Sequence, residues 1–530
     1  FQLSIDPWLE EADIEDFEDG GFSNFSWEFS GNADWTIDES NVFEGVNSGK
    51  SGSIDHSEES AISITLDVVE DGNISFYKKV SCENVGSQTG NYYDFLSFSI
   101  DGIEMAKWAG EMDWSPPRAF RLNGNFDGSG VVILNQLQPG TRYEFQAGWV
   151  NTQEDVALDW SAVEQGQFLT NQPDASATRF FFGSCCYRFV GLDGEIQDDR
   201  ADKIFAEMSS RATSSKPDFV LFGGDQVYAD SMYKFGAAST REDFDALYRE
   251  SFSQPHLAKL LRETNSYMIL DDHEIENNWP ARANAELWTS KYPAAIKAYQ
   301  IYQASHSPAA PLNQAGTYLD RDPDRFWYTF SRGPADFFVM DVRTERVLSR
   351  WPWQRRMIGD IQEQAFIEWL DRDPDRIKVL VTSVLLFPEQ RRPFRGKDAW
   401  EGFMHQRQRL LEAMGRSRSD KLVVLSGDVH ASLYACLTLN GGKQVHSWTC
   451  SGLFWPTALR AFRWYRPMIR VPGVLHGGWG KPLGKVEVPG EVFSDNAFSE
   501  VTFDAEGASF QLFDRRQRPI SETSQKIRWR

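Results

Sequence analysis

Four short apolar runs, far apart in the sequence, each stop at a residue able to bind a metal ion. The runs and the residues that follow them are 179–182 before Cys185, 219–222 before Asp225, 267–270 before Asp272 and His273, and 422–425 before Asp428 and His430. Helical patterns separate these runs, so they predict buried strands of an α/β protein. Because ligands bind at the carboxyl ends of such strands, we expect thiolate, carboxylate and imidazole groups at one edge of the sheet.

The helical patterns are confined to the last two thirds of the chain. Two sets of apolar residues are each assigned to one helical face: Ile204, Phe205 and Met208 in a helix over 199–213, and Ile361, Phe366, Trp369 and Leu370 in a later helix. We therefore expect one large α/β domain over residues 174–530.

The front of the chain has the alternating pattern of β-strands instead. Leu96, Phe98 and Ile100 alternate with serine and run into Asp101-Gly102, which is a strong hairpin signal. We expect an acidic β-sandwich, similar to a jelly roll, over residues 1–116. A small β unit over 117–173 has a pattern similar to the later strands of fibronectin type III domains.

Negative charge is concentrated in these first two predicted domains. The chain has 77 acidic and 54 basic residues, of which residues 1–170 hold 31 and 7, leaving 46 and 47 for the remainder. Such a surface argues against nucleic acid as a partner, because phosphate backbones attract Lys and Arg. The acidic front is either a solvated surface or a module that binds calcium or carbohydrate.

The rest of the composition bounds the cellular context only loosely. No run of apolar residues approaches the ~20 that a membrane span needs, so no span is expected. The five cysteines are odd in number and widely spaced, which is not a disulfide scaffold. The sequence begins at Phe1 without a signal segment, as it would after signal removal or in a truncated chain, and the expected location is secreted or periplasmic.

Asp225 and Tyr228 lie in the segment Gly-Asp-Gln-Val-Tyr, where a pair of glycines allows the backbone to turn sharply off the strand. Both side chains can then reach one centre. The alternative is a turn carboxylate beside a packed tyrosine.

Two further pairs favour a metal site more strongly. Asp271 and Asp272 are adjacent at a strand end and repel each other unless a cation compensates, although an aspartate there can also cap a helix. Asp428 and His430 are two residues apart on extended backbone, so they point the same way and can reach adjacent metals.

Jointly these segments resemble the PhoD-like alkaline phosphatases of the calcineurin-type metallophosphoesterase superfamily. Order and spacing agree over roughly 175–520, in the segments 179–185, 224–228, 271–278, 341–343 and 426–430. The resemblance implies an αββα sandwich with metals at its rim. It implies Fe3+ bound by Cys185, Asp225, Tyr228 and His430, and a second site, for Ca2+ or another divalent metal, formed by Asp225, Asp272 and Asp428.

The resemblance also implies that Asn278 and Arg343 lie near the phosphate. Cys186 adjoins Cys185 and is an alternative thiolate ligand. Residues 381–390 contain no histidine, where the superfamily usually offers one, and this fits an oxygen-liganded second metal.

The expected reaction is hydrolysis of a small phosphate ester. A hydroxide bridging the two metals attacks phosphorus, His273 protonates the leaving oxygen, and Arg343 grips the phosphate. Two alternatives remain open. One is a phosphodiesterase, including phospholipase-D-like activity, and the other is an inactive surface protein that binds carbohydrate or calcium.

Overall fold

The structure is a computed structural model of the 530-residue chain. It describes residues 2–7, 13–15, 17–42, 45–65, 72–82, 94–100, 103–108, 111–115, 130–132, 134, 137–147, 164–187, 200–230, 237–281, 283–308, 323–390, 398–455 and 469–529. The chain divides into two compact units, Phe1–Arg121 with Gln146–Gln165, and Leu122–Phe145 with Gly166–Arg530.

The first unit consists of short antiparallel strands. One sheet has the order β10-β7-β1-β2, and the other pairs are β3-β6, β4-β5 and β8-β9. The strands are β1 Gln2–Pro7, β2 Asp13–Glu15, β3 Trp27–Gly31, β4 Thr36–Asp38, β5 Ser48–Lys50, β6 Ser60–Ile64, β7 Gly72–Ser81, β8 Leu96–Ile100, β9 Ile103–Trp108 and β10 Glu111–Ser115. The described secondary structure here is all β, as the alternating pattern predicts. Asp101 and Gly102, the predicted hairpin turn, lie outside the described residues.

One further sheet precedes the α/β part of the chain. It pairs β11 (Arg142–Ala147) with β12 (Glu164–Leu169). The division at residues 116 and 173, the jelly-roll topology and the likeness to fibronectin type III domains stay predictions.

Two large sheets form the second unit. The first has the order β15-β14-β13-β27-β28-β29, with β23 also paired to β13, and the second has the order β16-β17-β18-β20-β22-β21-β26-β25. The first sheet contains β13 Ala177–Cys186, β14 Phe219–Phe222, β15 Ser266–Met268, β23 Ser451–Phe454, β27 Ala497–Asp504, β28 Gly507–Asp514 and β29 Gln525–Arg528. The second contains β16 Tyr328–Arg332, β17 Ala335–Met340, β18 Ile377–Thr382, β20 Leu422–Ser426, β21 Leu433–Leu439, β22 Gln444–Thr449, β25 Val474–His476 and β26 Pro482–Glu487. A short ladder joins β19 (Glu389–Gln390) to β24 (Ile469–Arg470).

The two sheets pack against each other through alternate residues of their strands. Phe180 of β13, Phe219 of β14 and Phe337 of β17 share one buried cluster. Phe181 points to the other face of β13, where it packs with the helical residues of another cluster. Because successive strand residues face opposite sides, each apolar strand supplies both the layer between the sheets and the layer under the helices.

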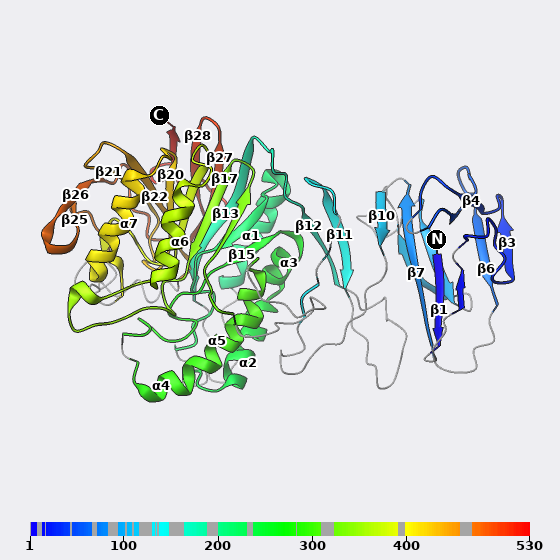
Figure 1. The fold of residues 1–530 in the computed structure, drawn as a ribbon, viewed down its shortest axis with the longest axis horizontal. Helices are drawn as coiled ribbons and strands as arrows, with labels where there is room; N and C mark the ends of the chain where they lie inside the picture. The colour runs from blue at the N-terminus through cyan, green and yellow to red at the C-terminus, as the bar shows by residue number, and fades with distance from the viewer. Residues whose placement is uncertain are drawn as a thin grey trace. The chain divides into compact units, whose positions relative to one another are not determined.

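Helices cover the outer faces of both sheets. Two core clusters place α1 and α3 on the first sheet, and α6 and α7, which lie side by side in Figure 1, on the second. The helices are α1 Arg200–Ser215, α2 Arg241–Phe252, α3 Pro255–Glu263, α4 Ala285–Thr289, α5 Lys291–Tyr302, α6 Asp360–Asp371 and α7 Met404–Arg416, with 3-10 turns η5 Ala304–His306, η6 Pro352–Gln354, η7 Trp400–Phe403 and η8 Gly478–Gly480. Among the described residues, no helix combines the length and the apolar character required to cross a bilayer.

The mixed α/β character of this unit is confirmed, and the predicted strand over 219–222 matches β14. The helix predicted over 199–213 corresponds to α1, with Ile204, Phe205 and Met208 buried on one face. One assignment to a helical face was wrong. Ile361 is 78% exposed, whereas Phe366 and Leu370 are buried. A separation of five residues turns a helix by about 140° beyond one full turn, so Ile361 cannot share their face.

Phe337 is a sensitive point of the inter-sheet core. Its ring lies 5.5 Å from those of Phe180 and Phe219 and 4.5 Å from that of Phe330. We expect Phe337→Ala to lower the free energy of unfolding by about 3–5 kcal/mol, because a buried ring is replaced by a cavity. The exposed Ile361→Ala is the control, with a change of less than about 0.5 kcal/mol. Chemical denaturation followed by circular dichroism measures both, and equal effects would contradict the packing described.

Candidate metal centre

The carboxyl ends of strands from both sheets meet in one group of loops. β13 ends at Cys185 and Cys186, and Asp225 follows β14 after two glycines. Asp271, Asp272 and His273 follow β15, and Asp428 and His430 follow β20. The strands of each sheet that lead to these loops run parallel to one another, so their ends lie at one edge.

The backbone at these loops adopts a conformation that L-residues rarely take. Five site residues have positive φ: Cys185 at 60°, Asp225 at 56°, Asn278 at 60°, Asp428 at 69° and His430 at 48°. Such residues cluster where function requires a fixed side-chain direction. Gly224 supports the turn, since it has φ +99° and a Cβ there would lie 2.6 Å from the Cβ of Asp271.

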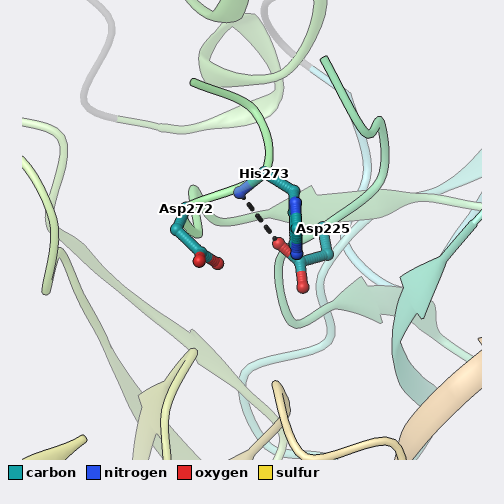
Figure 2. Close-up of side chains that lie close together, drawn as sticks. All are labelled: Asp225, Asp272 and His273. Carbon is teal, nitrogen blue, oxygen red and sulfur yellow. Dashed lines mark hydrogen bonds between the residues drawn. The ribbon is translucent and has the colours of Figure 1, made fainter. Parts of the chain in front are cut away.

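Four carboxylates converge within this edge. One oxygen from each of Asp225, Asp271, Asp272 and Asp428 lies within 4.8 Å of the others, and Asp225, Asp272 and His273 form a second such group. Figure 2 shows the carboxylates of Asp225 and Asp272 close together, with the backbone N–H of His273 donating to Asp225 Oδ1 over 3.2 Å. Oδ2 of Asp271 is buried without a hydrogen-bond donor, and Oδ1 of Asp272 makes no hydrogen bond although the guanidinium of Arg343 lies 3.3 Å away. Carboxylate oxygens in that state fit a cation.

The other predicted ligands lie close to Asp225 or to one another. The Sγ of Cys185 lies 3.3 Å and the hydroxyl of Tyr228 3.4 Å from Asp225 Oδ2. The Tyr228 hydroxyl also lies 3.4 Å from Nε2 of His430. The structure therefore brings all four residues of the predicted iron set into one contact chain.

Strand alternation distinguishes the two adjacent thiols. Cys185 faces the carboxylates and is also 3.1 Å from the hydroxyl of Ser451. Cys186 lies on the opposite face, in the cluster beneath α1 and α3. This geometry favours Cys185 over Cys186 as a ligand.

Burial and mutual repulsion set the pKa values in the cluster. Burial, together with neighbouring charged groups, raises the pKa of Asp225 and of Asp428 well above the usual range, and that of Asp271 to about 6. Burial also raises the pKa of the Cys185 thiol to about 12. These buried groups therefore favour their neutral forms. A bound cation would favour the ionised forms instead.

Two groups respond to their charged neighbours more than to burial. Burial opposes ionisation of Asp272, but the guanidinium of Arg343 and the imidazolium of His273 lower its pKa to about 2. Burial disfavours the charged form of His273, but the carboxylates of Asp272 and Asp230 raise its pKa to about 9. His273 is thus poised to carry a proton.

Asp230 was missed in the sequence. Its Oδ1 lies 2.6 Å from Nδ1 of His273, and its Oδ2 accepts the backbone N–H of Asn277 over 2.8 Å. It therefore fixes the orientation of the imidazole and leaves Nε2 as the ring nitrogen that can serve a substrate. Only its position two residues after Tyr228 hinted at a role.

Residues 381–390, which lack a histidine, supply neutral polar groups instead. The Ser383 hydroxyl donates to Asp271 Oδ1 over 2.7 Å, and Gln390 Nε2 donates to Asp428 Oδ2 over 2.7 Å. Neither residue was singled out from the sequence. Both orient carboxylates of the cluster.

Arg343 and Asn278 support the cluster in different ways. The guanidinium of Arg343 is fully buried, with Nε 2.5 Å from Asp271 Oδ1 and Nη2 3.3 Å from Asp272 Oδ1. Its Nη1 bonds Asp398 Oδ1 over 2.6 Å and the carbonyl of Trp279 over 3.2 Å. The backbone N–H of Asn278 donates to Asp272 Oδ2. The predicted contacts of Arg343 and Asn278 with phosphate stay predictions.

Glu274 ties the loops of two strands together from beneath. Its buried carboxylate accepts the backbone N–H groups of Asp225, Gln226 and Asp271 over 3.2, 2.7 and 3.0 Å. Gln303 Nε2 lies 3.4 Å from the same carboxylate. Burial raises the pKa of Glu274 to about 7, although these N–H donors oppose the rise.

These features define a two-sheet α/β protein with a carboxylate-rich, metal-competent edge. The chain belongs to the PhoD-like phosphatase family, whose family model matches residues 186–459. The match includes the candidate ligands from Asp225 to His430 and begins one residue after Cys185.

Individual proteins are similar to parts of this chain. Alkaline phosphatase D of Bacillus subtilis (strain 168) is 27% identical over 248 residues, which are 41% of this chain and 42% of the relative. The alignment thus spans less than half of that relative. The solved structure of PhoD matches with a TM-score of 0.51 at 17% identity, covering 73% of this chain and 78% of that one. A dimetal phosphatase from Danio rerio has a TM-score of 0.39 at 11% identity, covering 67% of this chain and 100% of that one.

Glu274 offers a direct test of how the loops are held. In Glu274→Leu three buried backbone N–H groups lose their acceptor, and we expect the free energy of unfolding to fall by about 3 kcal/mol or more. Glu274→Gln retains a carbonyl oxygen and should lose clearly less. Urea denaturation followed by tryptophan fluorescence measures both variants. A loss in the leucine variant no greater than in the glutamine variant would show that the carboxylate does not hold these loops.

Proposed function

We propose that this chain is a metal-dependent phosphoesterase that hydrolyses small phosphate esters. The observation that carries the proposal is the convergence of four carboxylates within 4.8 Å, with Oδ2 of Asp271 buried and lacking a hydrogen-bond donor. Membership of the PhoD-like phosphatase family supports the same reaction class.

The donor set divides into two halves that favour different cations. Cys185, Tyr228 and His430 offer thiolate, phenolate and imidazole, a set suited to a transition metal such as Fe3+. Asp271, Asp272 and Asp428 offer only oxygen, which suits a hard cation such as Ca2+. Asp225 contacts both halves and would bridge them. When bound, the cations supply Lewis acidity that activates water and neutralises charge on the phosphoryl group.

His273 is the residue placed to protonate the leaving group. Its Nδ1 is held by Asp230 over 2.6 Å, and its ring lies on that of Tyr228 with centroids 4.2 Å apart. The imidazolium would donate its Nε2 proton to the leaving oxygen. In this proposal Asp230 is a positioning residue, since it acts through the imidazole.

Other parts of the predicted function stay open. A location outside the cytoplasm is a proposal, as is binding of calcium or carbohydrate by the acidic front of the chain.

Asp225→Asn is the main test of the metal-dependent reaction. We expect the bound metal and the hydrolysis of p-nitrophenyl phosphate to be lost while the fold is kept. The substitution replaces the carboxylate that would be shared by both halves of the donor set with a neutral amide of the same shape. Elemental analysis, the phosphatase assay and circular dichroism measure the three properties. The exposed Asp360→Asn, 76% exposed at the start of α6, is the matched control and should retain both metal and turnover. Full activity of Asp225→Asn would refute the proposal.

Asp230→Asn tests the positioning of His273. We expect kcat to fall about 10–100-fold with unchanged metal content, because the imidazole loses the carboxylate that orients it. His273→Asn should lose about 10²–10⁴-fold. Two residues that act as one unit are not additive, so the double variant should be no slower than His273→Asn alone. Additive losses in the double variant would show that Asp230 acts independently of the imidazole.

A further inference from the structure

A stack of exposed aromatic rings lies outside the metal centre. The rings of Trp351 and Trp353 have centroids 5.0 Å apart, those of Trp353 and Trp479 are 5.4 Å apart, and His405 lies 5.2 Å from Trp479. Trp351, Trp353 and Trp479, hereafter the tryptophan surface, are 47%, 44% and 79% exposed. Three exposed indoles in contact with one another are unusual on a protein surface, because exposed apolar residues are normally scattered singly.

The backbone conformation at Trp479 is strained. This residue has φ +56°, which a bulky side chain rarely adopts. The segment folds closely over α7, because a Cβ on Gly478 would lie 2.1 Å from Nδ1 of His405. Burial of the Trp479 ring does not account for the strain, since the ring is the most exposed of the three. Strain of this kind points to function.

The tryptophan surface lies towards the edge of the sheet that carries the metal centre. Trp353 belongs to η6, between the end of β17 and the start of α6. His405 lies in the first turn of α7. In crossovers between the parallel strands β17, β18 and β20, each helix begins at the edge where the preceding strand ends. The candidate ligands follow strands at this same edge.

The charges of the two segments differ from those of the whole protein. The chain carries a net charge of -23, but residues 347–359 and 470–486 contain no aspartate or glutamate. They contain six cations, namely Arg350, Arg355, Arg356, Arg470, Lys481 and Lys485. Four of these cations are paired with carboxylates of flanking or neighbouring elements: Arg356 with Asp360, Arg470 with Glu389, Lys481 with Glu412 and Lys485 with Glu487. The segments themselves therefore present cations beside exposed indoles.

The stacking geometry argues against a sugar as the occupant. A pyranose requires an open aromatic face, but Trp353 is flanked by an indole on each side, with interplanar angles of 27° and 30°. The guanidinium of Arg350 lies 5.3 Å from the ring centroid of Trp351, and His405 meets Trp479 at 74°. Trp353, at the centre of the stack, consequently has an indole against each of its sides. Exposed indoles beside Arg and Lys match the boundary between lipid headgroups and acyl chains.

We propose that the tryptophan surface docks the protein onto a phospholipid bilayer with anionic headgroups. The indoles insert at the headgroup boundary, and the cations of residues 347–359 and 470–486 contact the lipid phosphates. This docking does not depend on catalysis at the metal centre.

Vesicle binding of the full chain tests the proposal. The probe is large unilamellar vesicles of phosphatidylglycerol and phosphatidylcholine in equal parts, at low ionic strength, with sedimentation as the readout. We expect the wild type to bind, and Trp353→Ala/Trp479→Gly to lower the partition coefficient at least about tenfold, because binding scales with inserted apolar area. Glycine suits the positive φ at residue 479, so this substitution should leave the fold intact.

The controls separate docking from other effects. Trp288→Ala removes an indole that is 37% exposed elsewhere and should bind vesicles as the wild type does. Arg350→Glu/Lys481→Glu should weaken binding to anionic vesicles more than binding to phosphatidylcholine alone. The proposal is overturned if the wild type does not bind, or if the tryptophan variant binds equally well. It is also overturned if the surface proves to mediate retention on insoluble polysaccharide or dimer formation in light scattering, with either property lost in that variant.

Discussion

Repulsion between carboxylates buried side by side governs the structure of this site. Two unit charges 4 Å apart interact by about 4 kcal/mol at an effective dielectric constant of 20, and one oxygen from each of four aspartates lies within 4.8 Å of the others. Arg343 contacts Asp271 and Asp272 and compensates part of this charge. Burial, followed by the repulsion that remains, raises the pKa of Asp225 and of Asp428 well above the usual range. A cation bound at this edge would therefore also reduce the repulsion between the loops that form it.

The loops orient the carboxylates and their neighbours by means of strained backbone conformations. Positive φ at a residue other than glycine costs on the order of 1–3 kcal/mol, and Cys185 tolerates it less readily than aspartate, asparagine or histidine does. Hydrogen bonds from outside each loop hold these conformations, as when Glu274 binds three N–H groups and Ser451 accepts the N–H of His430 over 2.8 Å. The candidate ligands are thus held in place by hydrogen bonds within the protein.

The parts of this arrangement that depend on local pattern were predictable from sequence. Buried strands such as β14 and β20 are continuous apolar runs, and the residue types at their ends indicate a metal site. Asp230 and Gln390 were not predictable, because their contacts depend on how loops distant in sequence fold onto each other. The misassigned Ile361 has a local cause, since an apolar residue in the first turn of a helix need not lie on its buried face.

The burial of Arg343 changes the role that its position in the sequence suggests. A guanidinium at a strand end beside a phosphoesterase-like site suggests a phosphate grip, but here it is fully buried and bonded to Asp271, Asp398 and the carbonyl of Trp279. To contact phosphate through these nitrogens, it would have to leave carboxylates unpaired in a dry interior, which costs several kcal/mol. Its contacts are those of a fixed positive charge beneath the cluster. Such a charge keeps Asp272 ionised and compensates part of the negative charge of the cluster.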